Sequence, residues 1–317
     1  MSMRTRSFDF YKNRYRFFAI SMAFIALGVV MMLVYGLKLD IQFRGGSMLN
    51  YSYTGEVDEE GVRDLAAQHL NATVSVQTTK ALSTEKGSGQ RQTIVVNVAG
   101  DAAVSEDEQS ALRQALAERY PEQNIEVGEV VVVEPFIGRE MLRNALLAVL
   151  IAAVLIVAYV WIRFRSISGP SAGVFALLAL LHDVLIAFFS FVIFRFSLNE
   201  SLLAVILSIL GWSVNDTIVI YDRIRENAQK NNGERTLAEL VNLSIHQSLS
   251  RSVITSACCF LAIIVAYVFA AAYNITSIKE FTLPMAIGLF AGTYSSIFLA
   301  TPFWAMWKMR KDAKATI

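Results

Sequence analysis

Residues 211–227 read GWSVNDTIVIYDRIREN, and this stretch opens inside one of the most apolar segments of the chain. It nevertheless places Asn215 and Asp216 side by side before any charged flank arrives. If the segment crosses a membrane, an ionisable group in it costs on the order of 2.5 kcal/mol or more and usually faces the interior of a helix bundle. The carboxyl group of Asp216 therefore needs an explanation beyond solubility.

The whole chain has the composition of a membrane protein. Of its 317 residues, 55% are hydrophobic and 17% are charged, which is rare for a soluble domain of this size. Apolar runs near 20 residues, long enough to cross a hydrocarbon core of about 30 Å as a helix, recur along the sequence. The pattern predicts a polytopic α-helical membrane protein with six spans, at residues 17–37, 142–162, 171–194, 199–221, 252–273 and 281–303.

The spans are arranged as one and then five, with a long polar segment between the first and the second. Only the fourth and fifth spans are joined by a long loop within the group of five, at 222–251. The predicted organisation is a basic segment at 1–16, a helix at 17–37, an external domain at 38–140, a five-helix bundle at 141–307 and a basic tail at 308–317.

Lys and Arg near the span ends indicate the orientation, because positively charged loops are translocated poorly. Four basic clusters fall on the same side of a six-span chain: before span one, between spans two and three, after span four and after span six. Both termini are therefore predicted to be cytoplasmic, and the segment 38–140 to be external. The clusters comprise Arg4, Arg6, Lys12, Arg14, Arg16, Arg163, Arg165, Arg223, Arg225, Lys230, Arg235, Lys308, Arg310, Lys311 and Lys314.

The external segment has the pattern of a small α+β domain. Its alternating and helical stretches follow the order βαββαβ, which is typical of a ferredoxin-like domain. His69, at the end of its first helix, is interpreted as a surface residue because a metal site needs several donors at set spacing. The strands are predicted at 47–53, 73–78, 92–98 and 124–133, and the helices at 57–70 and 105–119.

Charge and cysteine content exclude several function classes. A net charge of +1 gives no global attraction to nucleic acid or to an acidic substrate. Cys258 and Cys259 are the only cysteines and lie next to each other, so neither a disulfide framework nor a zinc site is available. We interpret both as packing residues of an apolar run. No catalytic cluster and no metal site is predicted.

The candidate functional residues are the polar groups inside the spans. Asp183, next to His182, lies in the middle of the third span, and Asp216 lies in the fourth with Asn215 beside it. Arg251 begins the fifth span. Asp183 also fits an ordinary interhelical hydrogen bond. A separate interfacial charge cluster, which obeys the rule for positive cytoplasmic loops, consists of Asp222, Arg223 and Arg225.

Asp216 and Arg251 together predict a proton relay. Desolvation favours the neutral form of a buried carboxyl group, and a nearby arginine favours its charged form. A helix movement that alternately brings Arg251 near Asp216 and takes it away would bind and release a proton. A proton crossing the membrane potential is worth about 2.3 kcal/mol per 100 mV, enough to bias a conformational equilibrium.

Four motifs carry a family resemblance over essentially the whole chain. FRGG at 43–46 follows the first span, and VEPFIG at 133–138 precedes the second. GWSVNDTIV with the following DRIREN lies in the fourth span, and RSVITS at 251–256 opens the fifth. The chain resembles the SecF family, the smaller partners in the SecD–SecF accessory of the bacterial Sec translocase, which are related to the resistance-nodulation-division transporters.

The resemblance implies roles for individual residues. Asp216 and Arg251 match the family positions associated with proton-driven function, and Asp183 matches a further polar position. Gln42 and Glu134 depart from the acid and the glycine that are usual at the external hinge, outside the relay. The hinge motifs themselves contain Gly45, Gly46, Pro135 and Gly138.

The resemblance also implies a function and partners. The chain would be a subunit of the bacterial inner membrane that works with SecD and uses the proton-motive force to pull or release an exported unfolded chain outside the SecYEG channel. YajC, YidC and membrane lipids are further implied partners. The proton would be the coupling ion, without another cofactor and without enzymatic activity. A six-span bundle with one set of charges also looks like half of a pseudo-symmetric transporter, which SecD would complete.

Two alternatives stay open. If the chain were half of a proton-coupled small-molecule or lipid exporter, we would expect a roomy apolar pocket and a larger external portion. A scaffold without transport predicts that the substitution Asp216→Asn is silent. An intramembrane protease is less well supported, because none of the hydrolase motifs and no paired catalytic aspartates are present.

Overall fold

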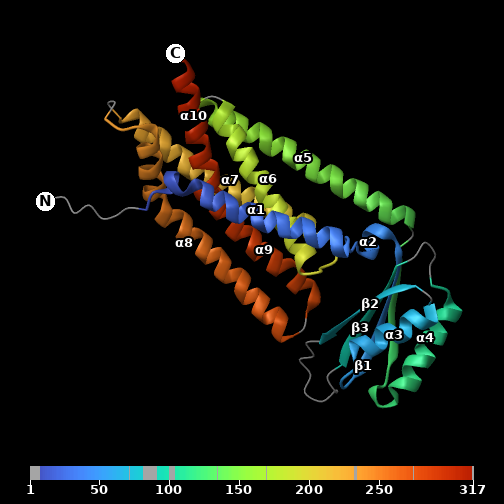
Figure 1. Cartoon of the computed structure of the whole chain (residues 1–317). Coiled ribbons are helices and arrows are strands. Elements are labelled where there is room, and N and C mark those ends of the chain that lie inside the picture. The colour runs from blue at the N-terminus through green and yellow to red at the C-terminus, as the bar shows by residue number, and fades with distance from the viewer. Residues whose placement is uncertain are drawn as a thin grey trace.

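The computed structural model describes residues 8–70, 72–80, 91–99, 104–133, 135–168, 170–231, 234–273 and 275–315. The expectations for Arg4, Arg6 and Glu134 lie outside these residues. A bundle of long helices carries a small α/β domain at one end (Figure 1). The first turn of α1 and the last turns of α10 are both at the end of the bundle away from this domain.

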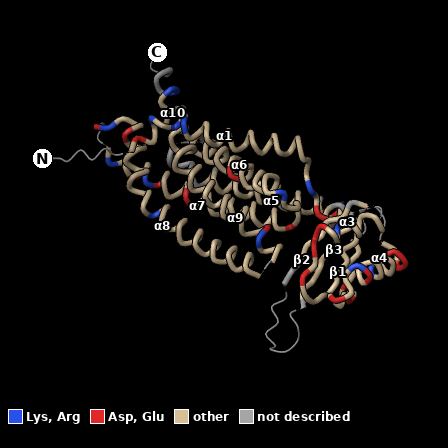
Figure 2. Tube along the Cα trace, turned by 60° about the horizontal axis from the view of Figure 1, so that its bottom comes forward, with Lys and Arg blue, Asp and Glu red and all other residues tan. Residues whose placement is uncertain are grey.

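Six helical segments among the described residues are long and apolar enough to cross a membrane, which confirms the predicted fold class. Charged residues gather at the two ends of the molecule and are sparse along the middle of the helices (Figure 2). The segments are α1 (Phe10–Tyr35), α5 (Pro135–Ser168), α6 (Pro170–Ile193), α7 (Glu200–Gln229), α8 (Leu237–Ala272) and α9 (Thr276–Ser295), which continues through the π-helical turn η2 (Ser296–Ala300) into α10 (Thr301–Ala315).

The segment predicted as a long loop after the fourth span is mostly helical. Helix α7 continues to Gln229, where Glu226 accepts hydrogen bonds from Arg223 and Lys230 on the same helix face. Helix α8 begins early because Thr236 and Glu239 form a capping box. Local charge pairs and a good N-cap thus extend both helices well beyond their apolar parts.

The domain between α1 and α5 has the predicted ferredoxin-like topology. Its four strands form one antiparallel sheet in the order β2-β3-β1-β4. Two helices cover the sheet, and α4 is opened by a capping box from Ser105 to Glu108. The elements are β1 (Gly46–Thr54), α3 (Glu59–Leu70), β2 (Thr73–Lys80), β3 (Arg91–Ala99), α4 (Glu106–Arg119), the 3-10 turn η1 (Pro121–Gln123) and β4 (Glu126–Val133).

The core of this outer domain lies between the sheet and the two helices. Val62 and Leu112 are fully buried on the helices against Ile94 of the sheet. Tyr51 is also buried there, and burial raises the pKa of its phenol group to about 12. The period-two pattern of the strands thus fills one face of the sheet, as the sequence predicts.

The hinge motifs lie where the outer domain joins the bundle. Gly45 and Gly46 have φ angles of 87° and 144°, a region that favours glycine, and they connect β1 to a short helix, α2 (Ile41–Arg44), that the sequence did not predict. Pro135 is the first residue of α5, a position that suits its fixed φ. Gly138 is buried in the first turn of α5, and α5 packs against α2.

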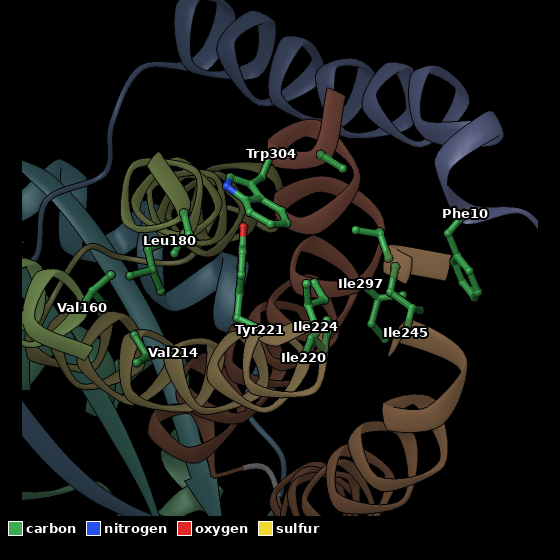
Figure 3. Packing of buried hydrophobic residues seen from close by; sticks show 14 of the residues in the cluster. Phe10, Val160, Leu180, Val214, Ile220, Tyr221, Ile224, Ile245, Ile297 and Trp304 are labelled. Atoms are coloured by element: carbon green, nitrogen blue, oxygen red, sulfur yellow. The ribbon is translucent and has the colours of Figure 1, made fainter. Parts of the chain in front are cut away.

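Helices α6, α7 and α9 form the interior of the bundle, and α1, α5 and α8 lie around them. The largest buried side chain is Trp304 of α10, whose ring meets that of Tyr221 of α7 edge-on with centroids 5.4 Å apart. Phe10, at the start of α1, reaches the same cluster from the other side (Figure 3). This cluster ties the ends of α1, α7, α8 and α10 together.

Candidate functional site

The carboxyl group of Asp216 lies in the interior of the bundle on α7. Asp216 is 2% exposed, and Ser256 Oγ on α8 donates a hydrogen bond to its Oδ2 atom at 3.5 Å. The hydroxyl groups of Ser256 and Thr293, the latter on α9, are 2.6 Å apart. Ser252, one turn before Ser256, and Thr293 also face the carboxylate. Hydroxyl groups from two neighbouring helices therefore surround Asp216.

Asp183 on α6 is enclosed more tightly, with no exposed surface. Its Oδ2 atom accepts hydrogen bonds from Ser213 Oγ at 2.5 Å and from Ser295 Oγ at 2.8 Å. Its Oδ1 atom lies 2.9 Å from Nδ1 of His182. The interhelical hydrogen bond that the sequence suggested is thus present, and His182 adds a contact to the same carboxyl group.

A stretch of α9 and η2 that the sequence analysis missed connects the two carboxyl sites. Thr293 lies next to the carboxyl group of Asp216, and Ser295 donates a hydrogen bond to the carboxyl group of Asp183. Ser296 hydrogen-bonds Thr217 of α7 at 2.8 Å. The available signal was the run GTYSS at 292–296 inside an otherwise apolar span, because several small and hydroxyl residues in one turn are typical of close helix contacts.

Arg251 lies closer than Asp216 does to the end of the bundle where α7 is connected to α8. It lines a cavity of about 370 Å³ together with Val219, Asp222, Arg223 and Glu226. Arg223 is held there by Gln247 of α8, with Nε to Oε1 at 2.8 Å. Among the described residues no ion pair joins Arg251 to Asp216. The structure therefore places the predicted relay arginine beside the interfacial charge cluster.

Two other residues differ from expectation, and a third agrees with it. Asn215 is exposed on α7 and points away from the Asp216 carboxylate, because neighbouring residues of an α-helix are about 100° apart around its axis. Cys258 is exposed on α8, so its interpretation as a packing residue within this chain is wrong; α8 meets the bundle with a face that includes Ser252 and leaves its other faces outside. His69 is exposed, as predicted.

The chemistry of this site is that of hydroxyl groups and carboxylates. Within the ranges that the structure describes, no group of three His, Cys, Asp or Glu side chains could hold a metal ion. A buried carboxyl group that accepts hydrogen bonds from hydroxyl groups can be ionised or protonated. It can change from one form to the other when a counter-charge moves. The polar cavity that Arg251 lines is the nearest place from which such a counter-charge could move.

The chain matches a known family of membrane proteins. The family model described as protein export membrane protein SecD/SecF, C-terminal, matches residues 113–310. The protein translocase subunit SecF of Alicyclobacillus acidocaldarius is 34% identical over 98% of this chain and 96% of its own length. The protein translocase subunit SecDF of Bacillus subtilis is 32% identical over 98% of this chain but only 39% of its own length.

Solved structures agree with these sequence matches. The crystal structure of SecDF from Thermus thermophilus, a translocon-associated membrane protein, superimposes with a TM-score of 0.76 at 30% identity. It covers 97% of this chain, and this chain spans 40% of that one. A SecDF structure in a super-membrane-facing form gives a TM-score of 0.69 at 29% identity. This chain, a membrane protein whose described residues include six apolar helices long enough to span a membrane, therefore belongs to the SecF family of protein translocase subunits.

Proposed function

We propose that this chain is the SecF half of a proton-driven device that promotes late steps of protein export in the bacterial inner membrane. The observation that carries the proposal is the carboxyl group of Asp216, which is buried among Ser256, Thr293 and Ser252 in a bundle of this family. A buried acid is costly to keep and is therefore a candidate for function rather than for stability.

The relay has two proposed states. In the first, the state described above, the hydroxyl groups of Ser256 and Thr293 contact the Asp216 site, and Arg251 lies in the cavity with Asp222. In the second, α7 and α8 slide past each other until the guanidinium group of Arg251 reaches Asp216 and favours its charged form. Val219 lies three residues, or about 4.5 Å, from Asp216 along the axis of α7, and this distance sets the scale of that shift.

The proposal includes partners and an orientation. SecD is the expected partner, because the chain corresponds to about 40% of the solved SecDF chain and a half-transporter needs a second half. The SecYEG channel, an exported unfolded chain, and YajC or YidC would complete the assembly. The outer domain would face the outside of the inner membrane, with both termini cytoplasmic, and the subunit would act in transport rather than as an enzyme.

One observation bears on the alternative of a small-molecule or lipid exporter. An apolar cavity of about 440 Å³ lies between α8 and α9 and reaches Ser256 and Thr293. Such a cavity is what an exporter of apolar compounds would need. The full-length likeness to SecF subunits and the single small outer domain favour protein export over this alternative.

The test replaces Asp216 by Asn and Arg251 by Met in cells that depend on this subunit. Assembly with SecD and proton-dependent release of an exported protein are measured for each variant. We expect assembled complexes with release lowered by about 100-fold, on the scale of one lost proton-transfer group. Glu200→Gln, an exposed acid on the same helix, is the matched control. Normal release by assembled Asp216→Asn complexes would reject the relay and favour the scaffold.

A further inference from the structure

The linker between α1 and the outer domain is bonded to the loop that precedes α7. The amide of Leu198 donates to the carbonyl oxygen of Lys38 at 2.7 Å, and the amide of Asp40 donates to that of Leu198 at 3.1 Å. These bonds form a parallel bridge between Leu39 and Leu198. Two loops far apart in the sequence are therefore joined by their main chains.

A second contact joins the ends of α1 and α6 beside this bridge. Arg195, at the end of α6, has a φ angle of 61°, and its Nη1 atom donates to the carbonyl oxygen of Tyr35 at 3.3 Å. The guanidinium carbon lies 4.8 Å from the centre of the Tyr35 ring. The left-handed backbone at Arg195 turns the loop toward α1, so the linker is held at more than one point.

The side chain of Asn199 connects this loop to α7 and to α9. Its Oδ1 atom accepts from the amide of Ser201 at 2.9 Å, and Asn199 is thus the N-cap of α7. Its Nδ2 group donates to Oε2 of Glu280 at 3.5 Å. Glu280 belongs to α9 and is only 6% exposed. One amide side chain therefore joins the start of the helix that carries Asp216 to a buried acid.

Charged groups from the linker surround Glu280. Lys38 of the linker and Lys279 of the same helix lie close enough to attract the carboxylate of Glu280, whereas Asp40 of the linker repels it. A buried carboxyl group without compensating partners is destabilising, so these partners decide whether it is tolerated. Glu280 thus lies where the linker, the α7 N-cap and α9 meet.

We propose that Glu280 is a positioning residue that holds the outer-domain linker against the N-terminus of α7 and so transmits movements of α7 to the outer domain. This inference rests on the proton-driven function proposed above. Helix α7 is unbroken from Glu200 to Gln229, and Asp216 lies about 24 Å along the helix axis from Glu200. A rigid helix carries a shift at Asp216 to its own N-cap, and Glu280 passes that shift to the linker.

The test measures whether the outer domain responds to the state of Asp216. Spin labels are placed at Glu118 on α4 and Leu181 on α6, both exposed, in the full chain purified with SecD and lacking its native cysteines. The interspin distance distribution is recorded with Asp216 intact and with Asp216→Asn. Both distance measurements are then repeated in chains that also carry Glu280→Ala.

We expect Asp216→Asn to shift the distance distribution in the parent chain and to leave it unchanged in the Glu280→Ala chain. A shift of the same size in both backgrounds would overturn the role of Glu280 and leave the relay standing. No shift in either background, together with normal protein release by Asp216→Asn complexes, would overturn the relay and the inference together.

A second measurement separates positioning from folding. Hydrogen exchange of the Leu198 amide, which donates to the linker, is expected to be about tenfold faster in the Glu280→Ala chain. Glu280→Gln keeps the side-chain volume and an acceptor for Asn199, so it should retain slow exchange and tests the case in which the alanine variant does not fold. Glu200→Ala, an exposed neighbour of Asn199, is the matched control and should exchange as the parent does. Unchanged exchange in the Glu280→Ala chain would contradict the inference.

Discussion

Gly292 of α9 lies directly against Ser213 of α7: a Cβ atom built on Gly292 would be 3.1 Å from the Ser213 Cβ atom. This close approach brings Ser295, one turn of helix further on, within reach of Asp183. It also lets Ser296 contact Thr217. The hydroxyl network between the carboxyl groups therefore depends on a glycine that has no side chain, and its carbonyl oxygen accepts hydrogen bonds from Ser295 Oγ at 3.1 Å and from Ser296 Oγ at 2.9 Å.

Gly292→Ala is expected to lower the free energy of unfolding of the full chain by about 1–3 kcal/mol, because an added methyl group must push α7 and α9 apart. Thermal unfolding in detergent measures the change. Gly211→Ala is the matched control, since a Cβ atom there meets no atom within 4 Å and alanine is a better helix former by up to about 1 kcal/mol. Equal destabilisation by the two substitutions would contradict the close packing at Gly292.

The acceptor role of Asp183 predicts a difference between two substitutions. Asp183→Asn keeps an oxygen that can accept from Ser213 and Ser295, whereas Asp183→Leu leaves both hydroxyl groups without that acceptor. The leucine variant should therefore be less stable than the asparagine variant by about 1–3 kcal/mol. Denaturation in detergent at constant lipid content measures both. A leucine variant as stable as the parent would mean that the network is not structural.

The capping box of α4 predicts a pH dependence in the outer domain. Hydrogen bonds from the amide and hydroxyl groups of Ser105 hold the pKa of Glu108 below its usual value. A lowered folded-state pKa contributes stability that is present above the unfolded pKa, about 4.3, and is lost as the pH falls through the folded value.

Ser105→Ala should therefore speed hydrogen exchange of the α4 amides at pH 7, by about fivefold for a lost N-cap of about 1 kcal/mol. The difference from the parent chain should shrink when both are compared below pH 4. Glu106→Ala, an exposed acid in the same turn without the reciprocal bonds, serves as control. A constant difference between parent and variant at both pH values would exclude the ionised capping box as its cause.

Substitutions of the two tryptophans of α10 are expected to differ in how much they destabilise the chain. Trp304 is 1% exposed and packs on Tyr221, whereas Trp307 is 40% exposed. Trp304→Ala should destabilise the chain by about 3–5 kcal/mol because it opens a cavity in the cluster that joins α1, α7 and α8. Trp307→Ala should cost about 1 kcal/mol or less, near the value of its contact with Lys311. Thermal unfolding of the two variants side by side checks the order.

The number of spans, their order and the outer-domain topology could be predicted from the sequence, because each depends on local pattern. Runs of apolar residues have to reach a membrane-crossing length, and strands alternate with period two. Gly45 and Gly46 likewise marked a hinge, and their φ angles lie in the region that favours glycine. The capping box at Ser105 was readable for the same reason, since its partners are three residues apart. Asp183 and Asp216 were identifiable because a carboxyl group in an apolar span is rare.

The partners of those carboxyl groups were decided only by the tertiary structure. The spans are apolar on all sides, so the sequence carries little information on which face of a helix meets its neighbour. Asn215 adjoins Asp216 in sequence but faces outward, while Ser256 and Thr293, from other helices, contact the Asp216 site. The position of Arg251, in the cavity beside the charge cluster, could not be predicted from the sequence either, because it also depends on how the helices pack. Helix packing over long sequence separations, rather than adjacency in the chain, sets the surroundings of a buried charge.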